Sequence, residues 1–214
     1  MDAIECIMTR RSIRKYLDIP VEWDKIGTIL EAGRVAPSSG NLQNWKFIVI
    51  LDKEKRAAIA EACLQQTWMA KAPVHIVIYS VVERVKQFYG VRGERLYSIQ
   101  NCAAAAMCML LAAHALGLGA CWVGAFDEDK IKSIVGGIEE VRPQIIITIG
   151  YPDEKPPMPT KYKLENIAYQ ERWRRGSQLK NLDYTMGEYS VFVQEGIKKG
   201  KEIIDKINKK LMKK

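Results

Sequence analysis

Four short apolar runs place the strongest limit on how this chain can fold. The runs are residues 46–51, 74–82, 120–123 and 144–149. Helical patterns separate them unevenly, at residues 2–9, 23–33, 53–65, 96–116 and 127–135. Because strands and helices do not alternate strictly as β-α-β, the order favours an α+β fold or a sandwich over a doubly wound parallel sheet.

The longest apolar stretch predicts a core helix and no membrane span. Residues 102–118 contain His114 and are dominated by alanine, which makes them weaker than a span of about 20 apolar residues. Alanine-rich faces allow helices to approach closely, so we expect residues 96–116 to form a central helix at a subunit interface. The N-terminus places its arginine pair after the apolar positions, which is not the order of a signal peptide, and a cytoplasmic protein is predicted.

Cysteine and histidine usage argues against a metal site. The five cysteines form no C-x-x-C pair, and their odd number favours reduced thiols over a disulfide framework. Of the two histidines, His75 lies in a strand pattern and His114 in a helical pattern. This leaves little material for a zinc site or a histidine-based catalytic triad.

The formal net charge of +8 is concentrated at one end of the chain. Residues 195–214 hold eight lysines and three acidic residues, and so carry five of the eight net charges. The rest of the chain is close to balanced, which does not predict a nucleic-acid-binding protein. The terminal segment predicts a basic amphipathic helix, because its apolar residues form one helical stripe. These are Ile197, Ile204, Ile207 and Leu211.

Two clusters of cations suggest an anion site. The first is Arg10, Arg11, Ser12 and Arg14. Guanidinium forks beside a hydroxyl suit a phosphate, and the alternative is a solvated basic edge. The second cluster, Lys161 and Lys163, follows a proline-rich loop and faces one side if the segment is extended. It either completes a phosphate site or is solvated.

A loop of unusual polarity precedes the first predicted strand. It reads A-P-S-S-G-N-L-Q-N-W over residues 36–45. Its hydroxyls, amides and exposed backbone offer hydrogen bonds to a flat polar ligand, and the alternative is a well-satisfied turn.

A glycine-rich segment at residues 117–127 is not a dinucleotide fingerprint. The G-x-G-x-x-G pattern is broken by Trp122, and no βαβ pattern precedes it. The neighbouring Cys121 has no histidine or basic residue near it in sequence, so we expect a buried structural thiol.

The order of these segments resembles the FMN-dependent nitroreductase family. The matching parts are R-R-S-x-R, A-P-S-S-G-N-x-Q-x-W, G-L-G-x-x-W-x-G-x-F-D, and I-G-Y-P followed by a basic pair. The resemblance covers about residues 3–173, and the A-P-S-S-G-N segment is its most specific part. It implies a nitroreductase-like fold, in which a central, mainly antiparallel sheet is flanked by helices. It also implies an intertwined homodimer with FMN at the subunit interface.

The resemblance assigns cofactor contacts to named residues. Arg10, Arg11 and Ser12 hold the FMN phosphate and ribityl chain, completed by Lys161 and Lys163. A cation at Arg14 lies near the flavin N1 and O2 edge, where it stabilises the negative charge that develops on reduction. Further contacts come from Pro37, Ser38, Ser39 and Asn41 of the partner subunit, from Gln66 with Gln65 as the register alternative, and from Val123, Gly124 and Ala125.

Two positions depart from the family pattern. The second cation of the C-terminal pair is often arginine there, so Lys163 lacks a bidentate fork. Some members carry glutamate where this chain has Gly124, so any role of that carboxylate is absent.

The activity implied is ping-pong hydride transfer from NADH or NADPH through flavin N5 to a small-molecule acceptor, such as a nitroaromatic or a quinone. No side chain is predicted to act as a catalytic acid or base. Relatives that dehalogenate, destroy flavin or use a deazaflavin donor are alternatives. Two hypotheses assign the chain to other functional classes. One is a flavin- or nucleotide-binding module without turnover, and the other is a protein that binds an anionic polymer.

The resemblance also divides the chain into two parts. Residues 1–173 are predicted as the FMN-binding domain and residues 174–214 as a C-terminal extension. We expect the extension's helix to pack as an arm on the dimer, with contact to an anionic surface as the alternative. Residues 83–99 are expected either to set acceptor selectivity or to form an ordinary exposed insertion.

Overall fold

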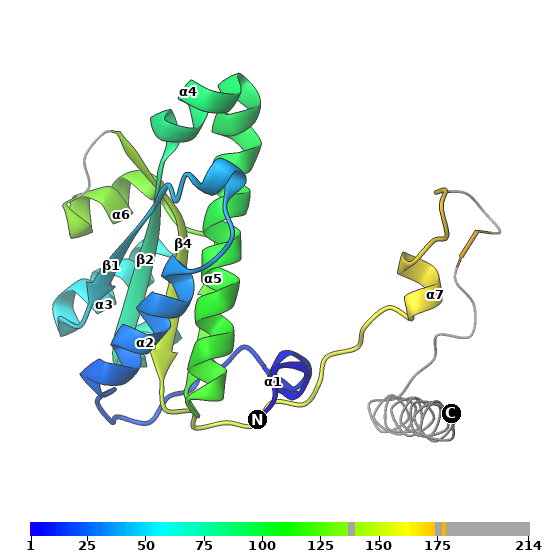
Figure 1. Ribbon diagram of the computed structural model, residues 1–214. Coiled ribbons are helices and arrows are strands. Elements are labelled where there is room, and N and C mark those ends of the chain that lie inside the picture. Colours follow the sequence, from blue (N-terminus) through cyan, green and yellow to red (C-terminus); the bar gives the residue numbers. More distant parts are fainter. Residues whose placement is uncertain (137–139, 174–176, 179–214) are drawn as a thin grey trace, which may run out of the picture. The chain divides into compact units, whose positions relative to one another are not determined.

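The computed structural model describes residues 1–136, 140–173 and 177–178 (Figure 1). The chain divides into two compact units, Met1–Met158 and Pro159–Lys214. The predicted boundary at residue 174 stays a prediction, and the predicted amphipathic helix, with Ile197, Ile204, Ile207 and Leu211, lies outside the described residues.

The first unit is built on an antiparallel sheet. In the described part of the chain this sheet has four strands in the order β1-β2-β4-β3, and each neighbouring pair is antiparallel. The strands are β1 Trp45–Ile50, β2 Val74–Val81, β3 Gly119–Val123 and β4 Val141–Gly150. The arrangement confirms the α+β alternative of the sequence prediction, because helices rather than a second sheet cover these strands.

Helices cover both faces of the sheet (Figure 1). On one face α2 (Trp23–Arg34) and α5 (Ser98–Ala115) pack against Ile76, Ile78 and Ile147. On the other face α3 (Lys53–Ala62) and α6 (Glu128–Val135) pack against Val77, Tyr79 and Ile146. Burial on both faces explains why β2 reads as a continuous apolar run rather than an alternating one.

The segment after β2 is helical, which the sequence analysis did not predict. It comprises α4 (Val82–Arg92) and a π-helical turn, η3 (Gly93–Tyr97), which leads into α5. Gly90 breaks the helix with φ of +57°, and Phe88 and Val91 are exposed. The predicted surface position of this segment is therefore confirmed, and its helical form is a feature that the sequence analysis left open.

One helical stretch, Val82–Ala115, is long and apolar enough to cross a membrane by length and composition alone. The break at Gly90 and the π-helical turn interrupt it. Within α5 the side chains of Cys102, Met109 and Leu110 belong to the core cluster beneath α2. Its apolar character is therefore that of a core helix.

The remaining elements are short. They are α1 (Ala3–Thr9), η1 (Ser39–Asn41), η2 (Thr67–Lys71) and, in the second unit, α7 (Leu164–Ile167). Asp2, Asp52 and Asp127 begin α1, α3 and α6, and each carboxylate accepts a backbone N–H of the first turn.

A buried histidine in β2 predicts a loss of stability in acid. His75 is fully buried, its Nε2 donates to the Met69 carbonyl at 2.9 Å, and burial lowers its pKa from 6.5 to about 4. Between these values the unfolded chain binds a proton that the folded chain does not. The free energy of unfolding therefore falls as the pH drops from about 6.5 to 4, by about 3 kcal/mol from this residue.

Urea denaturation at pH 7 and pH 4.5 measures this contribution. His75→Gln keeps a donor for the Met69 carbonyl but does not titrate, so its unfolding free energy depends less on pH. An equal pH dependence in the two proteins would show that His75 is not responsible.

Candidate functional site

The predicted phosphate cluster lies on an extended segment at the edge of the sheet. Residues 10–15, which we call the strap, follow α1 directly. The Ile13 N–H donates to the Ala120 carbonyl of β3 at 3.1 Å, and Ser12 forms a parallel bridge to the same residue. The Ile13 side chain is buried, so the strap is fixed on β3 with alternate side chains facing outward.

The two arginines at the start of the strap are half-buried rather than solvated. Arg11 Nη1 donates to the carbonyls of Met8 and Arg10 at 2.9 and 2.8 Å, which fixes its guanidinium. The Nε atoms of Arg10 and Arg11 are buried and have no hydrogen-bond partner among the described residues. A buried donor without an acceptor is costly, and an anion bound at this position would supply the missing acceptor.

Arg14 lies at the other end of the strap, over an aromatic ring. Its guanidinium carbon is 5.9 Å from the centre of the Trp68 ring. The backbone N–H groups of Arg14 and Lys15 both donate to the Glu154 carboxylate, at 2.5 and 3.1 Å. Glu154 therefore fixes the backbone that carries Arg14, a role that the sequence analysis did not detect.

A histidine from α5 is hydrogen-bonded to Thr9, the residue directly before the strap. The Thr9 hydroxyl donates to the Glu5 carbonyl at 2.6 Å, which leaves its oxygen to accept from His114 Nε2 at 2.9 Å. Burial, and then the charges of Arg10 and Arg11, lower the pKa of His114. His114 is thus a neutral donor beside two cations.

The polar loop at residues 36–45 is a fixed turn. Gly40, Asn41 and Gln43 have φ values of +52°, +55° and +47°. The Gln43 N–H donates to Ser38 Oγ at 3.0 Å, and the Ser39 N–H donates to Asn101 Oδ1 at 2.9 Å. The hydrogen bonds of a well-satisfied turn are therefore present, and Asn101 of α5 joins the loop to the core.

The strap and the loop are held at different ends of α5. Thr9, which directly precedes the strap, is bonded to His114 near the end of α5, whereas the loop is bonded to Asn101 near its start. Asn101 and His114 are 13 residues apart, which corresponds to roughly 20 Å along a helix.

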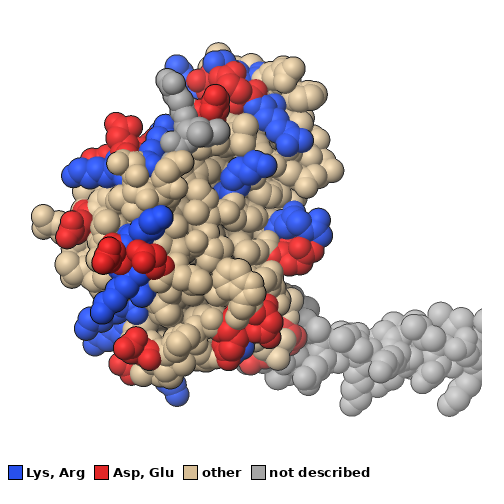
Figure 2. Space-filling view, turned by 90° about the vertical axis from the view of Figure 1, so that its left-hand side faces the viewer, with Lys and Arg blue, Asp and Glu red and all other residues tan. Residues whose placement is uncertain are grey.

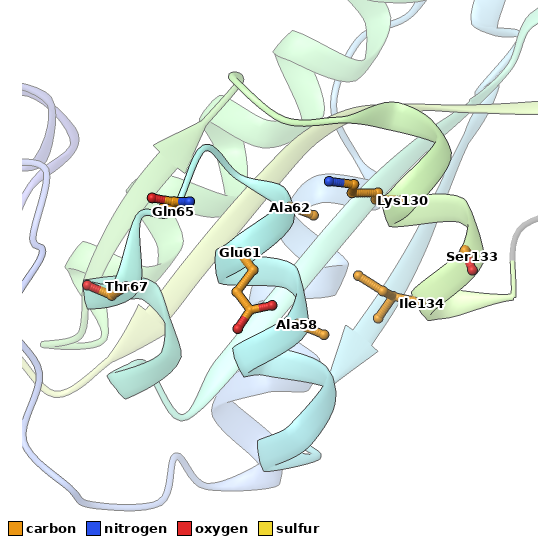
Figure 3. Close-up of a pocket in the computed structure, with 8 residues that line it drawn as sticks. All are labelled: Ala58, Glu61, Ala62, Gln65, Thr67, Lys130, Ser133 and Ile134. Atoms are coloured by element: carbon orange, nitrogen blue, oxygen red, sulfur yellow. The ribbon is translucent and has the colours of Figure 1, made fainter.

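The glutamine pair lies where α3 ends. Gln66 is half-buried and its Nε2 donates to the Cys63 carbonyl at 3.0 Å. Gln65 is exposed, with φ of +57°, and lines a groove of about 590 Å³ between α3 and α6 (Figure 3). The two side chains thus differ in direction, and the structure leaves both available as the predicted contact.

The groove combines polar and apolar groups. It is lined by Ala58, Glu61, Ala62, Gln65, Thr67, Lys130, Ser133 and Ile134. In Figure 3, Gln65 and Thr67 lie at one end and the side chains of α6 at the other. The face that contains α3 and α6 has acidic and basic side chains interspersed around an uncharged area, so the visible face carries no basic patch (Figure 2).

The predicted ring-facing residues lie at the end of β3 and directly after it. Val123 is buried at the end of the strand, whereas Gly124 and Ala125 are exposed. A Cβ at Gly124 would lie 3.4 Å from Trp122 Nε1, so the indole is next to this turn. Cys121 is buried and burial raises the pKa of its thiol, which confirms a structural thiol.

The two predicted lysines belong to the second unit. Lys163 precedes α7, and its Nζ is 4.0 Å from Glu165 Oε1. Lys161 is exposed. Their contribution to the phosphate site stays a prediction. Within the described ranges no group of three or more His, Cys, Asp or Glu residues is arranged to hold a metal ion.

These observations define the class of protein as an α+β protein whose antiparallel sheet carries a half-buried cationic strap on its edge strand. A sequence model described as the nitroreductase family matches residues 7–68 and 64–151. The chain is 36% identical over 179 residues to a Methanothermobacter thermautotrophicus protein, provisionally named NADH dehydrogenase/NAD(P)H nitroreductase. That match covers 81% of this chain and 88% of the relative.

Solved structures agree with this result. An FMN-dependent nitroreductase from Clostridium difficile R20291 has a TM-score of 0.63 and 31% identity, covering 80% of this chain and 98% of that one. NfrA2 from B. megaterium has a TM-score of 0.76 at 23% identity, covering 82% and 77%, and supports the fold alone. The chain belongs to the nitroreductase family, which confirms the resemblance seen in the sequence.

Proposed function

We propose that this protein is an FMN-dependent oxidoreductase that transfers hydride from NADH or NADPH to a small-molecule acceptor such as a nitroaromatic or a quinone. The observation that carries the proposal is the pair of half-buried arginines whose Nε atoms face no acceptor among the described residues. A phosphate satisfies such donors. The names of the relatives, which include FMN-dependent and NAD(P)H nitroreductases, support the same cofactor and donor.

The strap residues have separable roles in this proposal. Arg10, Arg11 and Ser12 hold the phosphate and the ribityl chain, and Arg14 offers a fixed positive charge beside the flavin ring. The indole of Trp68 limits where the Arg14 guanidinium can lie. FMN, when bound, supplies the hydride chemistry at N5.

A homodimer follows from the distance between strap and loop. We infer that the strap of one subunit meets residues 37–41 of its partner, because the two segments are anchored near opposite ends of α5. Ile4 and Ile7 of α1 are 55% and 50% exposed, and Met107 of α5 is 36% exposed. Apolar side chains of this size on α1 and α5 favour burial by a second subunit. A cytoplasmic location stays a prediction.

The visible absorption spectrum tests the proposal directly. The purified protein is expected to show a flavin spectrum that bleaches when NADH or NADPH is added without oxygen, and to oxidise the donor steadily when a quinone is supplied. Bleaching without turnover would favour a specialised reaction of the same fold. A protein that neither carries nor takes up FMN would contradict the proposal.

The charge at Arg14 is expected to affect reduction more than cofactor retention. Arg14→Ala should slow anaerobic reduction by NADH or NADPH about tenfold or more, because a fixed cation no longer stabilises the developing negative charge. The dissociation constant for FMN should change by less than about threefold, since the phosphate contacts remain. Stopped-flow absorbance and fluorescence titration measure the two quantities.

The neighbouring exposed cation is the control for this prediction. Lys15→Ala removes the same charge one residue further along the strap and should leave the reduction rate near that of the natural protein. Equal slowing in the two variants would show a general electrostatic effect rather than a specific role of Arg14.

A further inference from the structure

A buried polar network lies behind the loop that carries Ser39. Asn101 Nδ2 donates to Ser39 Oγ at 3.0 Å and to Asn44 Oδ1 at 2.7 Å, while its Oδ1 accepts the Ser39 N–H at 2.9 Å. Asn44 Nδ2 donates onward to Ser80 Oγ at 2.7 Å. Asn101 belongs to α5 and Ser80 to β2, so the network connects the loop to both elements.

The network is deeply buried and its amide groups are used completely. Asn101 is 5% exposed, Asn44 is 1% exposed and Ser80 is fully buried. Both N–H donors of the Asn101 amide and its oxygen have partners. A fully satisfied buried network fixes one arrangement of its members, because any other arrangement leaves a buried polar atom unpaired.

Asn101 makes two of its three hydrogen bonds to a single residue of the loop. The bonds to the N–H and the hydroxyl of Ser39 fix both the backbone and the side chain of that residue. The next residues, Gly40 and Asn41, adopt positive φ, and the Tyr89 hydroxyl lies 2.6 Å from where a Cβ of Gly40 would be. The turn therefore has little freedom on either side of Ser39.

We propose that Asn101 is a positioning residue for the cofactor: it holds Ser38–Asn41 in the conformation that meets FMN bound to the partner subunit. The inference rests on the proposed function, because the loop has this task only if FMN binds. It assigns to α5 a role in binding that the sequence pattern around Asn101 does not reveal. Asn101 acts through Ser39 and not by its own contact with the cofactor.

Asn101→Ala tests the proposal through FMN affinity and through the mobility of the loop without FMN. Fluorescence titration of the apoprotein should show FMN binding weakened about tenfold or more, because two hydrogen bonds that order Ser39 are lost. Hydrogen exchange of the apoprotein should show faster exchange in a peptide spanning residues 36–44. Asn101→Thr is a second variant, whose side chain is one bond shorter and leaves Ser39 unbonded while keeping a polar group beside Asn44.

Ser80→Ala is the matched control, because it removes the far end of the same network without touching Ser39. It should lower the unfolding free energy while FMN affinity stays within about threefold and loop exchange stays slow. If Ser80→Ala and either Asn101 variant weaken FMN binding equally, Asn101 is merely structural and the proposal is wrong. If the natural protein takes up no FMN, the proposed function itself fails, and the positioning role fails with it.

Discussion

Replacing both Arg10 and Arg11 by alanine should weaken FMN binding about a thousandfold. Each guanidinium is expected to make charge-assisted hydrogen bonds to the phosphate, and each such contact contributes about 2 kcal/mol. Two contacts contribute about 4 kcal/mol, and every 1.4 kcal/mol is about tenfold in the dissociation constant. The effect should be large because the Nε donors are already buried and face no acceptor among the described residues.

Riboflavin separates a phosphate contact from damage to the fold. It has the same ring as FMN but no phosphate, so the double variant should bind it within a fewfold of the natural protein. Arg34→Ala is the matched control, because Arg34 is an exposed arginine paired with Glu31 on α2, and exposed pairs contribute little. An equal loss of affinity for riboflavin and for FMN would show that the two arginines stabilise the fold and do not bind the phosphate.

The sequence predicted the sheet because its strands carry local signals. The apolar runs at residues 74–82 and 144–149 correspond to the two central strands, β2 and β4, which are buried on both faces. The motif at residues 36–45 was recognised because turn chemistry is also local. Local patterns did not reveal the end of α3 at Ala62, because Leu64 and Gln65 adopt positive φ although neither is glycine.

The residues that hold the candidate site in place could not be predicted from the sequence, for a different reason. Glu154 contacts the strap across 140 residues, His114 contacts Thr9 beside the strap across 105, and Asn101 contacts the loop across 62. Hydrogen bonds between distant residues leave no periodicity in the sequence, and each of these side chains taken alone reads as an ordinary polar residue. The residues predicted to touch FMN are thus visible in sequence motifs, whereas those that orient them appear only in the folded chain.

Two chains that each lose FMN should recover it when they form one dimer. The first chain carries Arg10→Ala and Arg11→Ala, and the second carries Asn41→Pro, which cannot adopt the φ of +55° that the loop requires. If each site combines the strap of one subunit with the loop of the other, the mixed dimer has one intact site and one site with both defects. We expect about one FMN per mixed dimer, half the content of the natural dimer.

Co-expression with two different affinity tags and tandem purification isolates the mixed dimer, and flavin absorbance against protein concentration gives the content. Each variant purified alone should be nearly free of FMN, since all of its sites share one defect. If the strap and loop of a site came from the same chain, every site of the mixed dimer would be defective and no FMN would return. The FMN content of the mixed dimer therefore tests directly whether two subunits build each site, as the spacing of roughly 20 Å between Asn101 and His114 along α5 leads us to expect.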